Sequence, residues 1–201
     1  MRLPQYIRVL NTLYGESLEV VSSQQLGEML QVTPAQIRKD LSYFGRFGKQ
    51  GRGYSIKNLL AGLRQIVGLD RHWNVALVGL GRLGRAILSY PGLVPEGFEI
   101  VAAFDSNHEI IGQTVGNLKV QTVGELDETV TALDITIGIV AVPTQHAQVV
   151  TDQLVRCGVR AILNYAPIPL QAPEGVKIRS VDPVLSLQTM TYYLVNCSSP
   201  S

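Results

Sequence analysis

The sequence predicts an α/β protein: a small, mainly helical N-terminal domain, then a parallel-sheet domain and a C-terminal helix. Two observations lead to this expectation. Up to residue 72, apolar residues recur at helical spacing and turn residues separate the helices. From residue 73, short apolar strands alternate with helices, which is typical of a parallel sheet covered on both faces. We therefore expect domains at residues 1–72 and 73–182, with a C-terminal helix and tail at 183–201.

Composition favours a folded protein that does not cross membranes. Of the 201 residues, 46% are hydrophobic and 16% charged, a balance that supports buried cores rather than disorder. No apolar run reaches the roughly 18 residues that span a bilayer, and the N-terminus lacks an apolar signal-type stretch. The cysteines, Cys157 and Cys197, form no C-x-x-C pair, so we expect no metal site. A cytoplasmic location is the simplest expectation.

Charge is distributed unequally between the two predicted domains. Residues 1–73 carry ten Lys and Arg against five Asp and Glu, a net charge of +5. Residues 74–201 carry seven against eleven, a net charge of −4. The basic residues cluster at Arg38, Lys39, Arg46, Lys49, Arg52 and Lys57. Such a cluster favours a polyanionic partner for the first domain, with an ordinary solvated basic face as the alternative.

Capping residues mark the helices of the first domain. Residues 3–14 form a first amphipathic helix. Ser22 with Gln25 has the spacing of a capping box, and Thr33 with Gln36 repeats that spacing a short turn later. Two capped helices joined by a tight turn match a helix-turn-helix motif, whose second helix enters the DNA major groove.

A glycine-rich basic segment follows these helices. Residues 45–54 contain four glycines interleaved with Arg and Lys, which suits a hairpin whose basic side chains are free for phosphates. A further helix is predicted over 59–69. Together these elements predict a winged helix that binds DNA, and the alternative is a helical hairpin with a surface loop. The candidate DNA contacts are Thr33, Gln36, Arg38, Lys39, Ser42, Tyr43, Lys49 and Arg52. Of these, Arg38 is the candidate base reader.

The second domain alternates strands and helices. Strands are predicted at residues 75–78, 99–105, 119–123, 135–142, 160–165 and 176–181, and helices at 85–90, 145–157 and 184–195. The most specific motif is Gly79-Leu80-Gly81-Arg82-Leu83-Gly84, between the first strand and the first helix. Its glycines would permit a tight turn, close approach of a pyrophosphate and close helix–strand packing, in that order. Amides at the helix N-terminus would stabilise the phosphates.

An acidic residue completes the dinucleotide-binding pattern. Asp105 ends the next strand, 21 residues after Gly84, where it can accept hydrogen bonds from the adenosine ribose. A carboxylate there would repel a 2′-phosphate, so NAD(H) is favoured over NADP(H). Val142 and Pro143 end a later strand on the same side and are candidates for the nicotinamide end, although Pro143 also suits a helix start. A glycine-rich turn without a ligand is the alternative.

Catalytic residues are not evident. Only a short stretch of residues follows the predicted nucleotide-binding region, too short for a substrate domain. His72, His108 and His146 fall in a linker, a loop and a helix, and we interpret them as surface residues. A dinucleotide bound without chemistry indicates a sensor rather than an enzyme. Two alternatives are a small NAD-dependent oxidoreductase and a co-repressor that binds a protein through its basic domain.

These motifs together resemble the Rex family of redox-sensing transcriptional repressors, along nearly the whole chain. The resemblance is carried by residues 32–45, 47–54, 73–84, 98–105, 161–167 and 192–194. It implies a homodimer that binds operator DNA when NADH is low and is released by NADH, while NAD+ favours the bound form. It also implies that the helix at 184–195 is exchanged between subunits.

The resemblance further implies residues that couple ligand state to domain orientation, at Arg8, Tyr90 and Asp182. The chain departs from the family pattern at two places. Asn107-His108 stands where an Asp-Pro pair usually follows the strand-end Asp, close to the adenosine. Pro183 stands where the family tends to place a large apolar residue that reaches the partner's nicotinamide.

Overall fold

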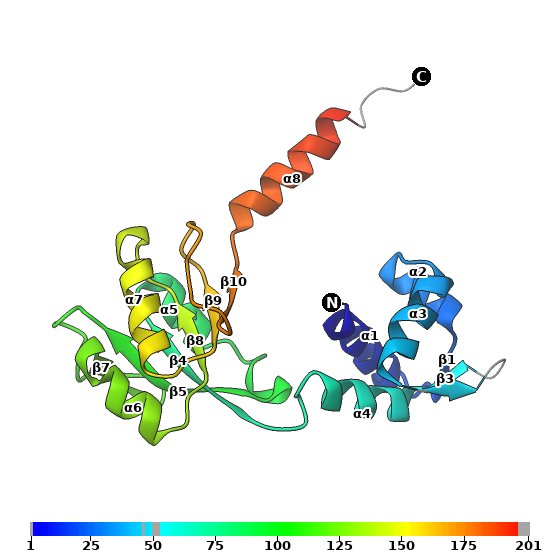
Figure 1. Cartoon of the computed structure of the whole chain (residues 1–201), viewed down its shortest axis with the longest axis horizontal. Helices are drawn as coiled ribbons and strands as arrows, with labels where there is room; N and C mark the ends of the chain where they lie inside the picture. Colours follow the sequence, from blue (N-terminus) through cyan, green and yellow to red (C-terminus); the bar gives the residue numbers. More distant parts are fainter. Residues whose placement is uncertain (1, 46, 50–52, 197–201) are drawn as a thin grey trace. The chain divides into compact units, whose positions relative to one another are not determined.

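The structure is a computed structural model that describes residues 2–45, 47–49 and 53–196 (Figure 1). The chain divides into two compact units, Met1–Arg71 and His72–Ser201. Within the described residues, no helix has both the length and the apolar character needed to cross a membrane.

The first unit packs helices around one apolar core beside a small antiparallel sheet. Its elements are α1 (Leu3–Gly15), β1 (Val20–Val21), α2 (Ser23–Leu30), α3 (Pro34–Phe44), β2 (Gly48–Lys49), β3 (Gly53–Ser55) and α4 (Ile56–Ile66). The strands lie in the order β1-β3-β2. Leu10 of α1, Leu26 of α2, Ile37 of α3 and Leu59 of α4 are all fully buried in the core. This is the winged helix-turn-helix arrangement that the sequence predicts.

Local hydrogen bonds explain where the helices begin. The capping box at Ser22 and Gln25 is complete. The predicted second box is only half present, because the Thr33 hydroxyl accepts from the Gln36 amide while the Gln36 side chain bonds elsewhere. Helix α4 begins three residues before the predicted start, because Ser55 caps it.

A single carboxylate ties α1 to α3. Asp40 accepts hydrogen bonds from the hydroxyl of Tyr6 at 2.5 Å, from the Gln36 amide nitrogen at 2.5 Å and from Arg2 at 3.1 Å. Burial and the neighbouring carboxylate raise the pKa of Tyr6 to about 12. The Tyr6 hydroxyl in turn holds the pKa of Asp40 below its usual value, helped by Gln36 and Arg2. The only acidic residue of α3 is therefore used to fix the helix against α1.

The second unit is a doubly wound α/β domain. Its elements are β4 (Trp73–Val78), α5 (Arg82–Leu88), the 3₁₀ turn η1 (Val94–Glu96), β5 (Phe98–Asp105), β6 (Thr114–Val115), β7 (Leu118–Thr122), the 3₁₀ turn η2 (Val123–Glu125), α6 (Leu126–Ala132), β8 (Ile137–Val140), α7 (Thr144–Arg156), β9 (Ala161–Asn164), β10 (Lys177–Ser180) and α8 (Pro183–Asn196). The sheet order is β10-β9-β8-β4-β5-β7-β6. All pairs are parallel except β6 with β7.

This strand order is that of a Rossmann-like fold, as the sequence predicts. Helices α6 and α7 cover one face of the sheet, where Leu126 and Leu154 belong to the same buried cluster as the strand residue Phe104. Helix α5 covers the other face, where Ile87 packs near Leu77. The connections reverse direction between β4 and β8, and open sheets of this kind bind ligands at that switch point.

Some boundaries differ from the predicted ones. Helix α5 begins at Arg82 rather than residue 85, directly after the glycine turn. Strand β8 is shorter than the predicted 135–142, because its ladder with β4 and β9 covers only Ile137–Val140. Helix α6 was not predicted, since its seven residues contain only two buried apolar side chains, Leu126 and Val130.

The Tyr6–Asp40 hydrogen bond generates a stability prediction. Tyr6→Phe should lower the free energy of unfolding by about 2 kcal/mol, because a partly buried hydrogen bond to a charged acceptor is lost. Denaturant unfolding followed by circular dichroism measures this. Tyr14→Phe is the matched control, since Tyr14 lies on the same helix with a 54% exposed side chain. Equal stability of the two variants would contradict the assignment.

The same pair predicts a pH dependence. The pKa of Asp40 is lowered in the folded state, so its contribution is complete above its unfolded pKa of about 4. The contribution is lost as the pH falls through the folded value. The stability difference between wild type and Tyr6→Phe should therefore be constant between pH 5 and 8, to within about 0.5 kcal/mol, and shrink below about pH 4.

Candidate functional site

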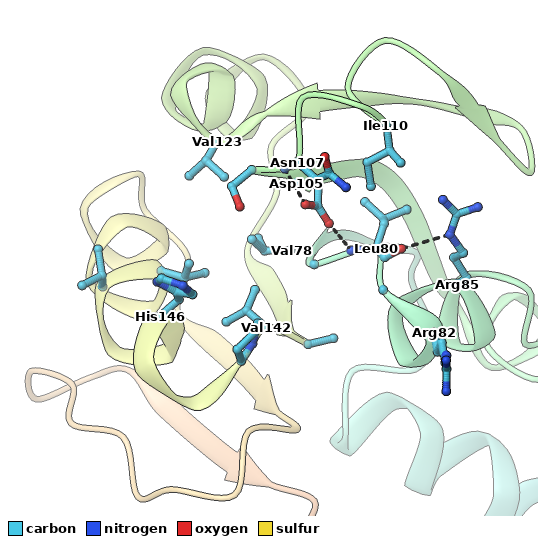
Figure 2. A pocket seen from close by; sticks show the side chains of 17 residues that line it. Val78, Leu80, Arg82, Arg85, Asp105, Asn107, Ile110, Val123, Val142 and His146 are labelled. Carbon is cyan, nitrogen blue, oxygen red and sulfur yellow. Dashed lines mark hydrogen bonds between the residues drawn. The ribbon is translucent and has the colours of Figure 1, made fainter.

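A cavity of about 720 Å³ opens at the carboxyl ends of the central strands of the second unit. That volume lies within the range of sites for drug-sized ligands and cofactors. Three walls enclose it: the loop and helix after β4, the loop after β5, and the β8–α7 connection (Figure 2). The lining residues are Val78, Gly79, Leu80, Gly81, Arg82, Arg85, Asp105, Ser106, Asn107, Ile110, Val123, Ala141, Val142, Pro143, His146, Val149 and Val150.

The glycines of the first wall occupy positions where side chains do not fit. Gly79 has a φ of +96°, and a Cβ there would lie 2.5 Å from the Ala141 carbonyl oxygen. A Cβ at Gly84 would lie 1.8 Å from the carbonyl oxygen of Gly79. At Gly81, by contrast, a Cβ would meet no protein atom within 4 Å. Two glycines are therefore needed by the fold, while the third leaves its backbone open to the cavity.

Asp105 joins two walls of the cavity. Its Oδ2 accepts a hydrogen bond from the Leu80 amide at 2.6 Å, and its Oδ1 accepts from the Asn107 amide at 2.8 Å (Figure 2). A carboxylate offers about four acceptor sites, so both oxygens can accept further bonds. Asp105 thus fixes the glycine turn while presenting acceptors to a polyol.

The two arginines differ in their surroundings. Arg85, which lines the cavity, donates through Nε to the Leu80 carbonyl at 3.0 Å and so supports the glycine turn. Arg82 is exposed and its side chain extends away from Asp105 in Figure 2. Leu83 and Gly84, the other predicted members of this motif, do not line the cavity. Leu83 is exposed at its edge, and Gly84 is buried beneath the turn.

The wall opposite the glycine turn is mainly apolar. Val142 and Pro143 both line it, and Pro143 also precedes the first turn of α7. His146 lines the same wall one helical turn later, whereas sequence reasoning placed it on the general surface. The signal was present in the spacing Pro143, His146 and Val149, which puts all three on one face of a helix. His72 and His108 do not line the cavity.

Several lining residues have no recognisable motif. Ser106, Asn107 and Ile110 come from the loop after β5, and Val123 follows β7. Only the sheet order brings these two strand ends side by side. Within the described residues, no cluster of three or more His, Cys, Asp and Glu could hold a metal ion.

In the first unit, α3 presents a polar face to solvent. Arg38, Lys39, Ser42 and Tyr43 are exposed at helical spacing, and Tyr43 is 84% exposed. Arg38 Nη1 donates to the Ser23 hydroxyl of α2 at 3.0 Å. Together these four residues form the α3 face, an exposed set of hydrogen-bonding groups suited to a groove of DNA.

The other predicted DNA contacts lie off the α3 face. Gln36 is half-buried and its side chain is occupied by Asp40, so it holds the helix rather than facing solvent. Thr33 is exposed at the helix cap. Lys49 lies on β2, paired with Gly53 in the wing. Arg52 lies outside the described residues.

The predicted coupling residues belong to both units. Arg8 is exposed on α1 of the first unit. Tyr90 is exposed just after α5 of the second unit, and its amide donates to the carbonyl of Ile87. Asp182 accepts a hydrogen bond from the Val184 amide at 2.9 Å and so caps α8.

Family models match both units of the chain. Residues 1–42 match the family described as putative DNA-binding protein N-terminus. Residues 70–168 match the CoA binding domain family.

Known proteins match almost the whole chain. The redox-sensing transcriptional repressor Rex of Chloroflexus aurantiacus is 54% identical over 193 residues, which cover 96% of this chain and 91% of that protein. A crystal structure of RSP in complex with β-NAD+ and operator DNA superposes with a TM-score of 0.91 at 38% identity, covering 96% of this chain and 89% of that one. RSP in complex with β-NADH gives 0.86 at 36% identity, covering 96% and 90%.

These relatives are repressors, which confirms the expectation of a regulator rather than an enzyme. The resemblance rests on both units, since the match extends over 96% of the chain. The chain belongs to the Rex family of redox-sensing transcriptional repressors.

Proposed function

We propose that this protein binds operator DNA through its first unit and NAD(H) in the cavity of its second unit, and that NADH releases the DNA. The observation that carries the proposal is the cavity at the strand switch point, where an open glycine backbone faces a strand-end carboxylate. The relatives that hold NAD+, NADH and operator DNA support it.

The two halves of the dinucleotide suit different parts of the cavity. Asp105 would accept hydrogen bonds from the hydroxyls of the adenosine ribose, and its negative charge disfavours binding of a 2′-phosphate. The backbone of Gly81 would approach the pyrophosphate. Arg82 and Arg85 also line the cavity and would balance the charge of the pyrophosphate. The nicotinamide would lie toward Val142 and Pro143.

Asn107-His108 stands where the family usually has an Asp-Pro pair, and local hydrogen bonds make this loop rigid in place of the proline. The Asn107 amide donates to Asp105, and its side-chain oxygen accepts from the Glu109 amide at 2.9 Å. This Asx turn fixes the loop without a proline. We infer that the adenosine end keeps its shape despite the changed residues.

We propose that operator binding uses the α3 face together with Lys49 and Arg52 of the wing. Arg38 reads a base, while Lys39, Lys49 and Arg52 bind phosphates. Thr33, Ser42 and Tyr43 complete the contact, and Gln36 acts through Asp40 by holding α3 in place. Such a protein acts in the cytoplasm, where its DNA lies.

We propose a homodimer in which α8 is exchanged between subunits. The helix exposes apolar side chains on all sides, including Leu185, Leu187 and Met190, each 60–61% exposed. A helix that is apolar all round needs a partner to cover it. Pro183 begins this helix, a position where proline is well tolerated, so the departure leaves α8 intact.

Ligand control then follows from two states of the dimer. One state spaces the two α3 helices for successive major grooves, and NADH stabilises the other. The shift cannot exceed the differential affinity of NADH for the two states. Arg8, Tyr90 and Asp182 are proposed to couple the cavity to the first unit.

NADH should dissociate the DNA complex, and NADPH should not. The probe is a duplex selected from a random library by the wild-type protein, titrated in a mobility-shift assay. Micromolar NADH is expected to release the duplex, while NADPH at the same concentration leaves it bound because Asp105 repels the 2′-phosphate. Identical titrations with NADH, NADPH and buffer would refute the proposal.

Asp105→Ala should weaken NADH binding by about 10- to 100-fold, the equivalent of lost hydrogen bonds to a charged acceptor. Calorimetry measures the affinity. DNA binding without ligand should be unchanged, and discrimination against NADPH should fall. Glu128→Ala on α6 is the control, because Glu128 is exposed and does not line the cavity. Unchanged NADH affinity in Asp105→Ala would remove this residue from the site.

The two neighbouring basic residues of α3 should differ in their effects. Arg38→Ala is expected to cost about 1–3 kcal/mol on the selected duplex and to relax the sequence preference. Lys39→Ala should weaken binding to all duplexes and reduce the slope of log K against log salt by about 1. Lys119→Ala, on the second unit, is the control. A reversed pattern for the two residues would overturn their assignments.

A further inference from the structure

The wing strands β2 and β3 are preceded by an aromatic side chain that packs against the core of the first unit. Phe47 directly precedes β2, is half-buried and packs against the apolar core. Gly45, on the other side of residue 46, ends α3 with a φ of +148°. A Cβ at Gly45 would lie 3.7 Å from the Cε2 edge of the Phe47 ring. The ring therefore sits at the junction of α3 and the wing.

The opposite edge of this ring meets a helix. Gly62 lies in the interior of α4, where glycine is less favourable than alanine for helix stability. A Cβ at Gly62 would lie 2.5 Å from Phe47 Cε1, and 3.3 and 3.4 Å from two further ring atoms. Unstrained carbon contacts are about 3.5–4.0 Å, so the ring occupies the place that a methyl group would need.

Both strands of the wing are thus connected to α4. Strand β3 runs directly into the helix through its capping residue Ser55 (Figure 1). Strand β2 is connected through the Phe47 ring on Gly62, two turns along the same helix. The β2–β3 pairing joins the strands, with Gly48 opposite Tyr54 and Lys49 opposite Gly53.

We propose that Phe47 and Gly62 are positioning residues for DNA binding, which set the wing strands β2 and β3 relative to α3. This inference rests on the proposed operator binding by α3 and the wing. The ring lies near the end of α3, where a Cβ added at Gly45 would be at ordinary contact distance, and it packs tightly on α4 at Gly62. A change in ring position moves β2, and with it Lys49, relative to the α3 face.

The effect of Gly62→Ala on DNA binding distinguishes this positioning role from an effect on helix stability alone. On helix propensity alone, Gly62→Ala stabilises α4. In this structure the new methyl displaces the Phe47 ring by about 1 Å or more. The variant should therefore remain folded, with wild-type NADH affinity, but hold the wing out of place.

Four full-length variants test the inference on the duplex selected by the wild-type protein: Gly62→Ala, Phe47→Leu, the double variant and Gly15→Ala. Gly62→Ala should lower DNA affinity by about fivefold or more, with a salt slope reduced by about 1. In the Phe47→Leu background, the same change should cost less than about twofold, because the clashing ring atoms are gone. Gly15→Ala is the matched helical control, since its Cβ would meet nothing within 4 Å.

A second measurement does not depend on DNA. In the NMR spectrum of the full chain, Phe47→Leu should shift the Gly62 amide signal and leave that of Gly15 in place. An unmoved Gly62 signal would overturn the packing itself. DNA affinity within about twofold of wild type in Gly62→Ala, or an equal loss in both backgrounds, would overturn the positioning role. Failure of the wild-type protein to bind any selected duplex would refute the proposed operator binding, and the positioning role with it, but not the packing.

Discussion

The close approach of three backbone segments at the centre of the sheet is the constraint on which the second unit depends. The turn after β4, the first turn of α5 and the residue after β8 meet at Gly79, Gly84 and Ala141. A side chain on either glycine would collide with a main-chain oxygen, which cannot move without shifting a strand. This contact lies at the switch point between β4 and β8. The packing that brings these strand ends together therefore also forms the floor of the cavity at their carboxyl ends.

The first unit uses a different device, polar ties between helices, to fix a surface. Asp40 accepts hydrogen bonds from Tyr6, Gln36 and Arg2, and so fixes the rotation of α3 about its own axis relative to α1. With that rotation, the α3 face points to solvent and Ile37 points to the core. Leaving the one carboxylate of this helix internally paired also reduces its repulsion of a polyanion.

Patterns with a local physical cause could be predicted from the sequence. The glycine spacing, the strand-end Asp105 and the Ser22 capping box each depend on contacts within a few residues or within one βαβ unit. What could not be predicted depends on tertiary contacts. Gln36 has the spacing of a capping residue but bonds to Asp40. The spacing of Pro143, His146 and Val149 puts them on one face of α7, but that this face lines a cavity depends on how α7 packs beside the glycine turn. Short α6 gave too few apolar residues for a periodicity.

The chemistry of the cavity also gives a reason why NADH rather than NAD+ would act as the proposed releasing ligand. NADH and NAD+ share the adenosine and pyrophosphate, so contacts at Asp105 and Gly81 contribute equally to both and cannot sense redox state. The forms differ at the nicotinamide, which is positively charged in NAD+ and neutral in NADH. Among the described lining residues Asp105 is the only carboxylate, and the proposed nicotinamide end is formed by Val142 and Pro143. An apolar wall penalises an unpaired cation and accepts a neutral ring, so a nicotinamide bound at this end of the cavity would favour the reduced form.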